Sequence, residues 1–235
     1  MRETKLGNRT GAILGRLQKL YPDADCELLY RNAYELLIAT ILSAQCTDKR
    51  VNSVAPSLFA RYPAASDLAS APLPEVEEII RPTGFFRAKA KSITACAQAL
   101  VADHGGDVPR DFDAAVKLRG VGRKTASVVL GHVYGIAAGI AVDTHVLRVS
   151  ARLGLTKARD PIHVEQDLMR IVPKGLWIKT TDLLIFHGRR VCEARKPRCG
   201  ECGVFDLCPW VSKAAFSMTA AKPDKPVAAK ARKKP

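Results

Sequence analysis

The sequence contains no apolar run of the roughly 18–20 residues that a membrane-spanning helix needs, so we expect no membrane anchor and no membrane partner. Its first residues, Met1 to Lys5, are polar and lack the apolar core of a secretory signal. We therefore expect the chain to remain in the cytoplasm, a reducing compartment where disulfides are rare. The seven cysteines are then better candidates for metal ligands than for disulfides.

Strand-like alternation of apolar and polar residues is also scarce, and only Ile140 to Val142 indicates extended chain. Elsewhere apolar residues recur at helical spacing, and residues 36–42 are apolar nearly all round, which is typical of a buried central helix. Asp48 is a candidate cap for a helix over 49–59. Asp160-Pro161 has the form of a helix start. The sequence therefore predicts an all-α fold, with no internal repeat.

Acidic residues are outnumbered, since 23 Asp and Glu face 37 Lys and Arg, which gives a formal net charge of +14. Such a balance favours a polyanionic partner, nucleic acid first and an anionic membrane surface second. The last residues, 217–235, are rich in lysine and proline and carry no apolar stripe. We expect this basic tail to be disordered and to add only loose attraction to phosphates.

The segment from Leu118 to Thr125 joins a helix expected at 111–118 to another expected at 123–134. Gly120 and Gly122 allow a tight turn with positive φ, and neither has a Cβ to block a close-approaching group. Because the turn opens a helix, its N–H groups and positive dipole end suit an anion such as a DNA phosphate. From these residues alone, an ordinary αα-hairpin with a glycine turn is an equally good interpretation.

Four of the cysteines lie close together in the spacing C-x6-C-x2-C-x5-C, at Cys192, Cys199, Cys202 and Cys208. Four thiolates so near in sequence can converge on one metal centre. Structural zinc accepts the same ligands, usually as two separated C-x2-C pairs. Only one such pair is present, and the uneven spacing favours an iron–sulfur cluster moderately over zinc. Cys26, Cys46 and Cys96 are scattered and are expected to act as small hydrophobic residues.

Taken together, these segments resemble the endonuclease III family of DNA glycosylases and abasic-site lyases. The residues Gly120-Val121-Gly122-Arg123-Lys124-Thr125-Ala126 are similar to its helix–hairpin–helix motif, although Arg119 stands where a proline is common. Val142-Asp143-Thr144-His145-Val146 is similar to its aspartate segment, and the cysteine spacing to its [4Fe–4S] loop. The resemblance runs from about Tyr34 to Pro209. It implies a [4Fe–4S] cofactor that braces a basic loop.

The resemblance also implies the catalytic pair. A lysine is usually a solvated charge, but Lys124 lies at a positive helix end beside Arg123, and both features disfavour its ammonium form. A neutral amine is what catalysis through a Schiff base needs. Lys124 would attack C1′ of the damaged nucleotide, and β-elimination would then cut the strand 3′ to the lesion. Asp143 would stabilise positive charge on the sugar and move protons, although an aspartate before Thr144-His145-Val146 is also a good helix N-cap.

Chemistry at C1′ requires the nucleotide to leave the stacked duplex. Gln45 matches the family residue that fills the gap, and Phe85 matches a residue that wedges into the opposite strand. His145 is a candidate for the lesion pocket, although a lone histidine beside a helix start is as often structural. Further DNA contacts are expected from Gly120, Gly122 and Arg123 of the hairpin and from Arg195, Lys196 and Arg198 of the cysteine loop.

The implied architecture has two helical lobes with DNA in the cleft between them. Residues 24–138 would form a helical barrel domain with the hairpin, and residues 1–23 with 139–216 an iron–sulfur domain. The expected function is removal of oxidised pyrimidines from duplex DNA, with cleavage at abasic sites, by a nucleoid-associated monomer. Two alternatives remain. One is a mismatch glycosylase that removes adenine or thymine, although Lys124 argues against the adenine enzyme. The other is a DNA-binding protein of the same fold with little catalysis.

Overall fold

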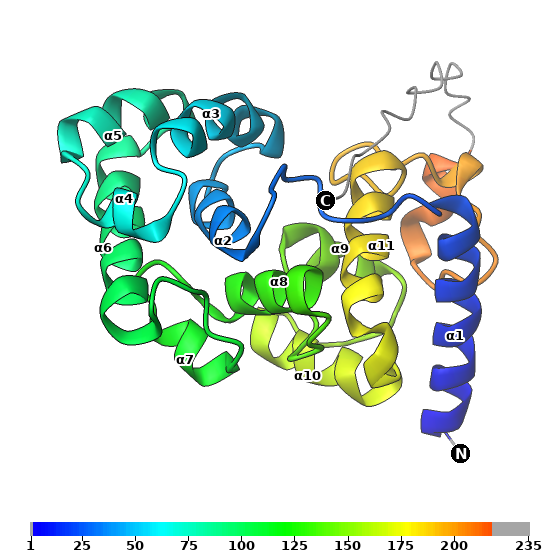
Figure 1. Cartoon of the computed structure of the whole chain (residues 1–235). Helices are drawn as coiled ribbons and strands as arrows, with labels where there is room; N and C mark the ends of the chain where they lie inside the picture. Colours follow the sequence, from blue (N-terminus) through cyan, green and yellow to red (C-terminus); the bar gives the residue numbers. More distant parts are fainter. Residues whose placement is uncertain (1, 218–235) are drawn as a thin grey trace. The chain divides into compact units, whose positions relative to one another are not determined.

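The computed structural model describes residues 2–217, with side chains from residue 6 onward, so nearly all of the expected basic tail lies outside the described residues. Within that range the fold is all-α, as predicted, and has no strand. Figure 1 shows the order of the helices, with four short 3-10 helices (η) between them: α1 (Arg2–Leu20), α2 (Ala33–Leu42), α3 (Asp48–Arg61), α4 (Ala65–Ala69), α5 (Leu73–Ile80), η1 (Arg81–Thr83), α6 (Phe86–His104), α7 (Phe112–Lys117), α8 (Arg123–Tyr134), α9 (Thr144–Arg152), α10 (Pro161–Ile171), η2 (Lys174–Leu176), α11 (Trp177–Arg190), η3 (Cys199–Glu201) and η4 (Val211–Phe216).

The chain divides into two compact units. One is continuous, from Cys26 to Ala138, and the other combines residues 2–25 with residues 139–217. Each has a hydrophobic core of its own. No helix within residues 2–217 is long and apolar enough to cross a membrane.

The core of the continuous unit is built around α2. Every residue of this helix from Tyr34 to Leu42 is buried, as its all-round apolar pattern predicted. Asn32 caps its first turn by accepting a hydrogen bond from the backbone N–H of Glu35. Helices α6 and α8 both pack on α2. The segments before and after α2 and α6 are thereby held on one rigid core.

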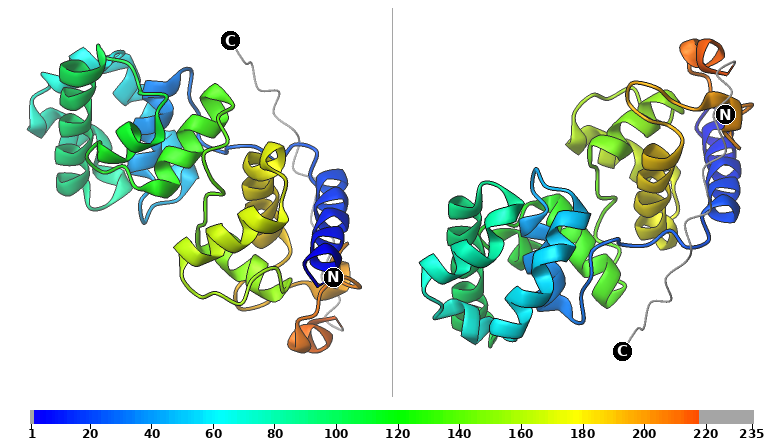
Figure 2. Two further views of the ribbon diagram at one scale, coloured as in Figure 1. Left: turned by 90° about the horizontal axis from the view of Figure 1, so that it is seen from below. Right: turned by 90° about the horizontal axis from the view of Figure 1, so that it is seen from above.

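The second unit joins the two ends of the chain. The apolar face of α1, with Ile13, Leu14 and Leu17, is buried against residues that follow Gly139. Both views in Figure 2 show α1 alongside α11. Helices α9 and α11 pack closely at Gly188 of α11, which has no Cβ. A Cβ there would stand only 3.0 Å from Cβ of His145 in α9. This close contact brings the aspartate segment next to the helix that leads into the cysteines.

Several helix boundaries follow the predicted signals, and others differ. Helix α8 spans the predicted 123–134, and Asp160 caps α10 through the N–H of His163. The predicted cap at Asp48 is wrong by one residue: Thr47 accepts from the N–H of Arg50, and Asp48 is the first helical residue. The expected extended segment at 140–142 forms no strand. It is a buried connection in which Ala141 N–H donates to Thr181 Oγ1 at 3.1 Å.

Candidate functional site

The turn between α7 and α8 has the geometry that its glycines predicted. Gly120 adopts φ +80°, the left-handed region that a residue with a Cβ rarely occupies. A Cβ there would also stand 3.3 Å from Ile41 Cγ2 of α2, so the turn lies directly on the central helix. The N–H of Val121 donates to the carbonyl of Leu118 at 3.1 Å and closes the turn. The hairpin is therefore fixed by the core of its unit.

Helix α8 begins immediately after this turn. Gly122 is its N-cap and has no side chain to satisfy the first-turn N–H groups. A Cβ on Gly122 would meet no atom within 4 Å. Lys124 is the second residue of α8 and is exposed, and the Arg123 guanidinium lies 4.9 Å from the ring centre of Phe112. A helix start with open space before it and two adjacent basic residues suits a bound phosphate.

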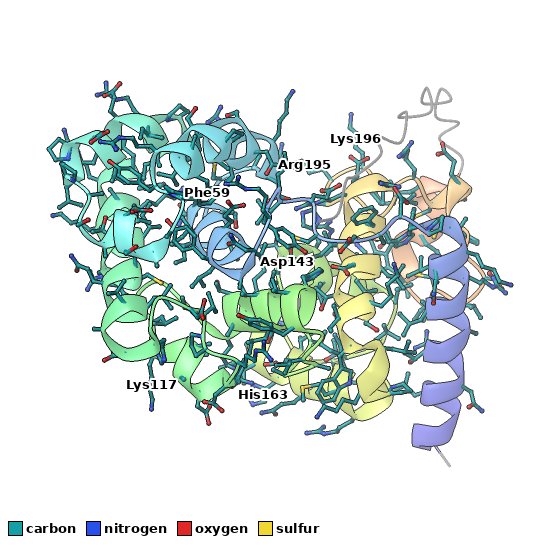
Figure 3. The ribbon with its side chains drawn as sticks, in the orientation of Figure 1. Phe59, Lys117, Asp143, His163, Arg195 and Lys196 are labelled. Atoms are coloured by element: carbon teal, nitrogen blue, oxygen red, sulfur yellow. The ribbon has the colours of Figure 1, made fainter. Side chains whose placement is uncertain are left out.

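Asp143 is the N-cap of α9, as the structural alternative in the sequence suggested. Its Oδ1 accepts hydrogen bonds from the N–H groups of His145 and Val146, both at 2.8 Å. The side chain is half-buried, and Figure 3 labels it. A carboxylate held by two backbone donors has a fixed orientation. Capping therefore positions the Asp143 carboxylate and does not compete with a role in proton transfer.

Two residues beyond Asp143, a chain of polar contacts leads to the first cysteine. His145 Nδ1 lies 3.1 Å from Arg148 Nη2, whose guanidinium also donates to Gly188 O at 2.9 Å and to Cys192 O at 3.0 Å. Because a guanidinium can only donate, Nδ1 is the acceptor and Nε2 carries the proton of the neutral imidazole. Burial lowers the pKa of His145, with a further lowering from Arg148. No pattern in the sequence indicated this role for Arg148.

Gln45 and Phe85 share an unusual backbone conformation. Among residues 2–217, they are the only residues other than glycine with positive φ, at +51° and +48°. Such conformations cost about 1–2 kcal/mol each and persist only where the surrounding structure enforces them. Both side chains are exposed, and 70% of the Phe85 surface is accessible. Two strained loops thus present a polar and an aromatic side chain to the solvent.

The four cysteines of the C-terminal motif line one small cavity, together with Arg152, His187, Trp210 and Lys213. Burial raises the pKa of the Cys202 thiol to about 11. A metal displaces that proton, since the thiolate is the ligand form. Four convergent sulfur atoms in a mostly apolar pocket fit a cubane iron–sulfur cluster, which takes four cysteine ligands.

Two side chains that the sequence did not single out contact the sulfur atoms of these ligands. His187 is buried, and its Nε2 lies 3.6 Å from Cys202 Sγ while its Nδ1 lies 3.1 Å from Tyr21 Oη. Arg152 Nη1 lies 3.4 Å from Cys192 Sγ, and its guanidinium also donates to Glu193 O at 2.7 Å. Donors of this kind stabilise negative charge on cluster sulfur. Their roles depend on contacts between distant segments, which no local pattern reveals.

The expected basic loop comes after the end of α11 at Arg190 and follows Cys192. Figure 3 labels two of its residues, Arg195 and Lys196. Arg195 and Lys196 are exposed, so both are available to a phosphate. Arg198 differs from them: it donates to the carbonyl of Arg190 and lies 3.4 Å from a carboxylate oxygen of Glu201. Arg198 therefore contributes at least in part to holding the loop together.

Comparisons with known proteins agree with this geometry. Residues 38–174 match the model of the HhH-GPD superfamily base excision DNA repair protein, and residues 192–208 match the iron–sulfur binding domain of endonuclease III. Endonuclease III of Synechocystis sp. is 54% identical over 86% of this chain and 92% of its own length. For the Bacillus subtilis enzyme the identity is 48%, over 83% of this chain and 89% of that protein.

Solved structures give the same result. A non-covalent endonuclease III–DNA complex is similar with a TM-score of 0.84 and 45% identity, over 89% of this chain and 98% of that chain. A trapped endonuclease III–DNA covalent intermediate matches with the same values. A thermostable thymine-DNA glycosylase has the same fold, with a TM-score of 0.79 at 24% identity over 88% and 98% of the two chains. The chain therefore belongs to the endonuclease III family, base excision repair DNA glycosylases with abasic-site lyase activity that carry a [4Fe–4S] cluster.

Proposed function

We propose that the chain removes oxidised pyrimidines from duplex DNA and cuts the strand 3′ to the abasic site, with Lys124 as the nucleophile. The observation that carries this proposal is the position of Lys124. Its side chain is exposed in the first turn of α8, directly behind the glycine turn that suits a DNA phosphate. That an endonuclease III 45% identical to this chain has been trapped as a covalent DNA intermediate supports a covalent route.

In this reaction the neutral Nζ of Lys124 attacks C1′ of the extruded nucleotide, and the bond from C1′ to the base breaks. The departing base takes the proton that the attacking amine loses. O4′ takes a proton from solvent as the sugar ring opens, which leaves a protonated imine between Nζ and C1′. The imine makes the 2′ proton acidic. Loss of that proton breaks the bond from C3′ to its phosphate oxygen, and water then hydrolyses the imine to release the amine.

Asp143 would stabilise the positive charge that develops on the sugar and move protons during these steps. The two backbone donors on Oδ1 support this role, because they fix the carboxylate before substrate binds. His145, adjacent on the same helix start, would line the lesion pocket as a neutral imidazole. The [4Fe–4S] cluster, held by the four cysteines, would brace the basic loop as a structural group.

Extrusion of the nucleotide leaves a gap in the duplex. We assign the filling of this gap to Gln45 and the wedge in the opposite strand to Phe85. Their positive φ values support the assignment, because strained residues in otherwise regular structure concentrate at functional sites. One stretch of phosphates would bind to the hairpin, at Gly120, Gly122 and Arg123. A second stretch would bind to the basic loop, at Arg195, Lys196 and Arg198. Phosphate contacts carry no sequence information. We therefore propose lesion-specific, sequence-indifferent binding by a monomer in the cytoplasm, associated with the nucleoid.

Borohydride reduction in the presence of duplex DNA tests the central assignment. The unmodified chain should form a covalent adduct with abasic-site or oxidised-pyrimidine DNA, and Lys124→Gln should form none while retaining duplex affinity. Lys117→Gln is the matched control, because it removes an exposed lysine from the other arm of the hairpin. An undiminished adduct in the Lys124→Gln variant would overturn the assignment. Duplexes with thymine or adenine mismatches, tested alongside, address the mismatch alternatives.

A further inference from the structure

Lys89 is the only lysine or arginine that is buried among the side chains of residues 6–217, with 5% of its surface exposed. Lysine is rarely buried unless its ammonium has a partner. Lys89 lies in the first turn of α6, directly after the loop that presents Phe85. The side chain has no role in the chemistry at C1′, so its burial calls for another explanation.

The contacts of Lys89 hold the Phe85 loop from both sides. Its Nζ donates to the carbonyl of Thr83 at 2.9 Å, before the strained residue, and its backbone N–H donates to the carbonyl of Phe85 at 3.0 Å. Thr83 is itself buried, and its hydroxyl donates to Ile80 O at 2.8 Å. Gly84 and Phe85 are the two residues of this loop with positive φ. Lys89 bonds to the carbonyl of Thr83, just before them, and to the carbonyl of Phe85 itself.

Cys46, which directly follows Gln45, belongs to the second strained loop. Burial lowers the pKa of Lys89, and Cys46 opposes that lowering. Cys46 is half-buried and packs against the core that also receives Phe86. The residues that follow Gln45 and Phe85 therefore pack on the same core.

We propose that Lys89 is a positioning residue that holds the Phe85 loop in its strained conformation, so that the aromatic ring is ready to enter the duplex. The inference rests on the proposed function, since it takes the wedge role of Phe85 as given. An exposed ring held in place before binding loses little conformational freedom when it inserts. Without the bond from Nζ to Thr83 O, the loop would relax out of its strained conformation.

The test follows unstacking of the base opposite the lesion. The probe is a duplex with a tetrahydrofuran abasic-site analogue, which cannot form an imine, placed opposite 2-aminopurine, which becomes fluorescent when it leaves the stack. Lys89→Met keeps an unbranched apolar chain and removes the donor. We expect it to lower the unstacked fraction or its rate by roughly tenfold, as for loss of one charge-assisted hydrogen bond. Duplex affinity should change far less.

A double-mutant cycle with Phe85→Ala makes the test specific. If Lys89 acts through Phe85, the effect of Lys89→Met should disappear once Phe85 is alanine. Equal effects of Lys89→Met with and without Phe85 would overturn the positioning role. Phe85→Ala that leaves unstacking unchanged would instead overturn the wedge assignment, and with it the premise of this inference. The result of borohydride trapping at Lys124 does not depend on either outcome.

Two further variants complete the experiment. Lys91→Met removes an exposed lysine two residues along the same helix and controls for the loss of one positive charge. An equal effect of Lys91→Met would show that charge alone is responsible and would contradict the inference. Lys89→Gln retains a shorter donor and is used in the same cycle if the methionine variant does not fold. It too must lose its effect in the Phe85→Ala background.

Discussion

The Arg148 guanidinium connects His145 to the first cysteine of the cluster loop, with Nη2 lying 3.1 Å from His145 Nδ1 and Nε donating to Cys192 O at 3.0 Å. A third contact, to Gly188 O, ties the same group to α11. The start of α9, which Asp143 caps, is therefore linked by one side chain to the segment that carries the metal ligands. A change at the cluster would be transmitted to the helix of Asp143 through these bonds.

Substitution of Arg148 by methionine should destabilise this unit and its cluster together. Loss of charge-assisted hydrogen bonds should lower the free energy of unfolding by about 2 kcal/mol, which corresponds to a fall of roughly 4–8 °C in melting temperature. Far-UV circular dichroism follows the melting of the helices, and absorbance at ~400 nm, where iron–sulfur clusters absorb, follows the loss of the cluster. Arg159→Met, an exposed arginine of the same unit, is the control and should change neither.

The two hairpin glycines should respond differently to alanine. At Gly120 the positive φ and the 3.3 Å approach to Ile41 should cost about 1–2 kcal/mol of stability, and duplex affinity should fall as well. Gly122 has extended backbone and open space, so Gly122→Ala should cost less stability than Gly120→Ala, through the poorer N-cap alone. Its new Cβ would face the proposed phosphate, and binding should weaken. Equal loss of stability in both variants would contradict this distinction.

His145 should make the stability of the chain depend on pH. Burial lowers its folded-state pKa below the ordinary value of 6.5. Above pH 6.5 the imidazole is neutral in both folded and unfolded states. As the pH falls below 6.5, the unfolded chain binds a proton that the folded chain resists, and stability is lost by up to about 1.4 kcal/mol per pH unit.

Replacing His145 with asparagine, which keeps an acceptor for Arg148, should reduce this loss between pH 6.5 and the lowered pKa of His145. The contribution of His187, whose pKa burial lowers to about 4, should remain. Denaturant unfolding at several pH values measures the slope. The same slope in the variant and the unmodified chain would assign the titration to another group.

The basic loop should contribute to the salt dependence of binding. Removing one phosphate contact reduces the slope of log affinity against log salt by about 0.9, so Arg195→Met with Lys196→Met should reduce it by roughly 2. The effect should be the same for damaged and undamaged duplexes. Arg198→Met should act mainly on stability, because Arg198 bonds within the loop. An unchanged salt slope in the double variant would exclude the loop from the DNA interface.

The sequence predicted best where local chemistry decides the structure. Glycines bound α8, and Asp160-Pro161 opens α10, because turn and cap preferences act within a few residues. The five-residue helix α4 was missed, since it is too short for a periodic pattern. The family resemblance supplied Gln45 and Phe85 as candidates, whereas their left-handed backbone is visible only in the structure. The roles of Lys89, Arg148 and His187 depend on partners brought near by tertiary packing.

The division of the chain has a consequence for its synthesis. Helix α1 leaves the ribosome well before the residues after Gly139 that cover its apolar face, with the 113 residues of Cys26–Ala138 in between. At translation speeds of 5–20 residues per second, that face waits for roughly 6–23 s. Throughout this interval Ile13, Leu14 and Leu17 are without their native neighbours. The apolar face of α1 is thus exposed on the nascent chain until the residues after Gly139 emerge.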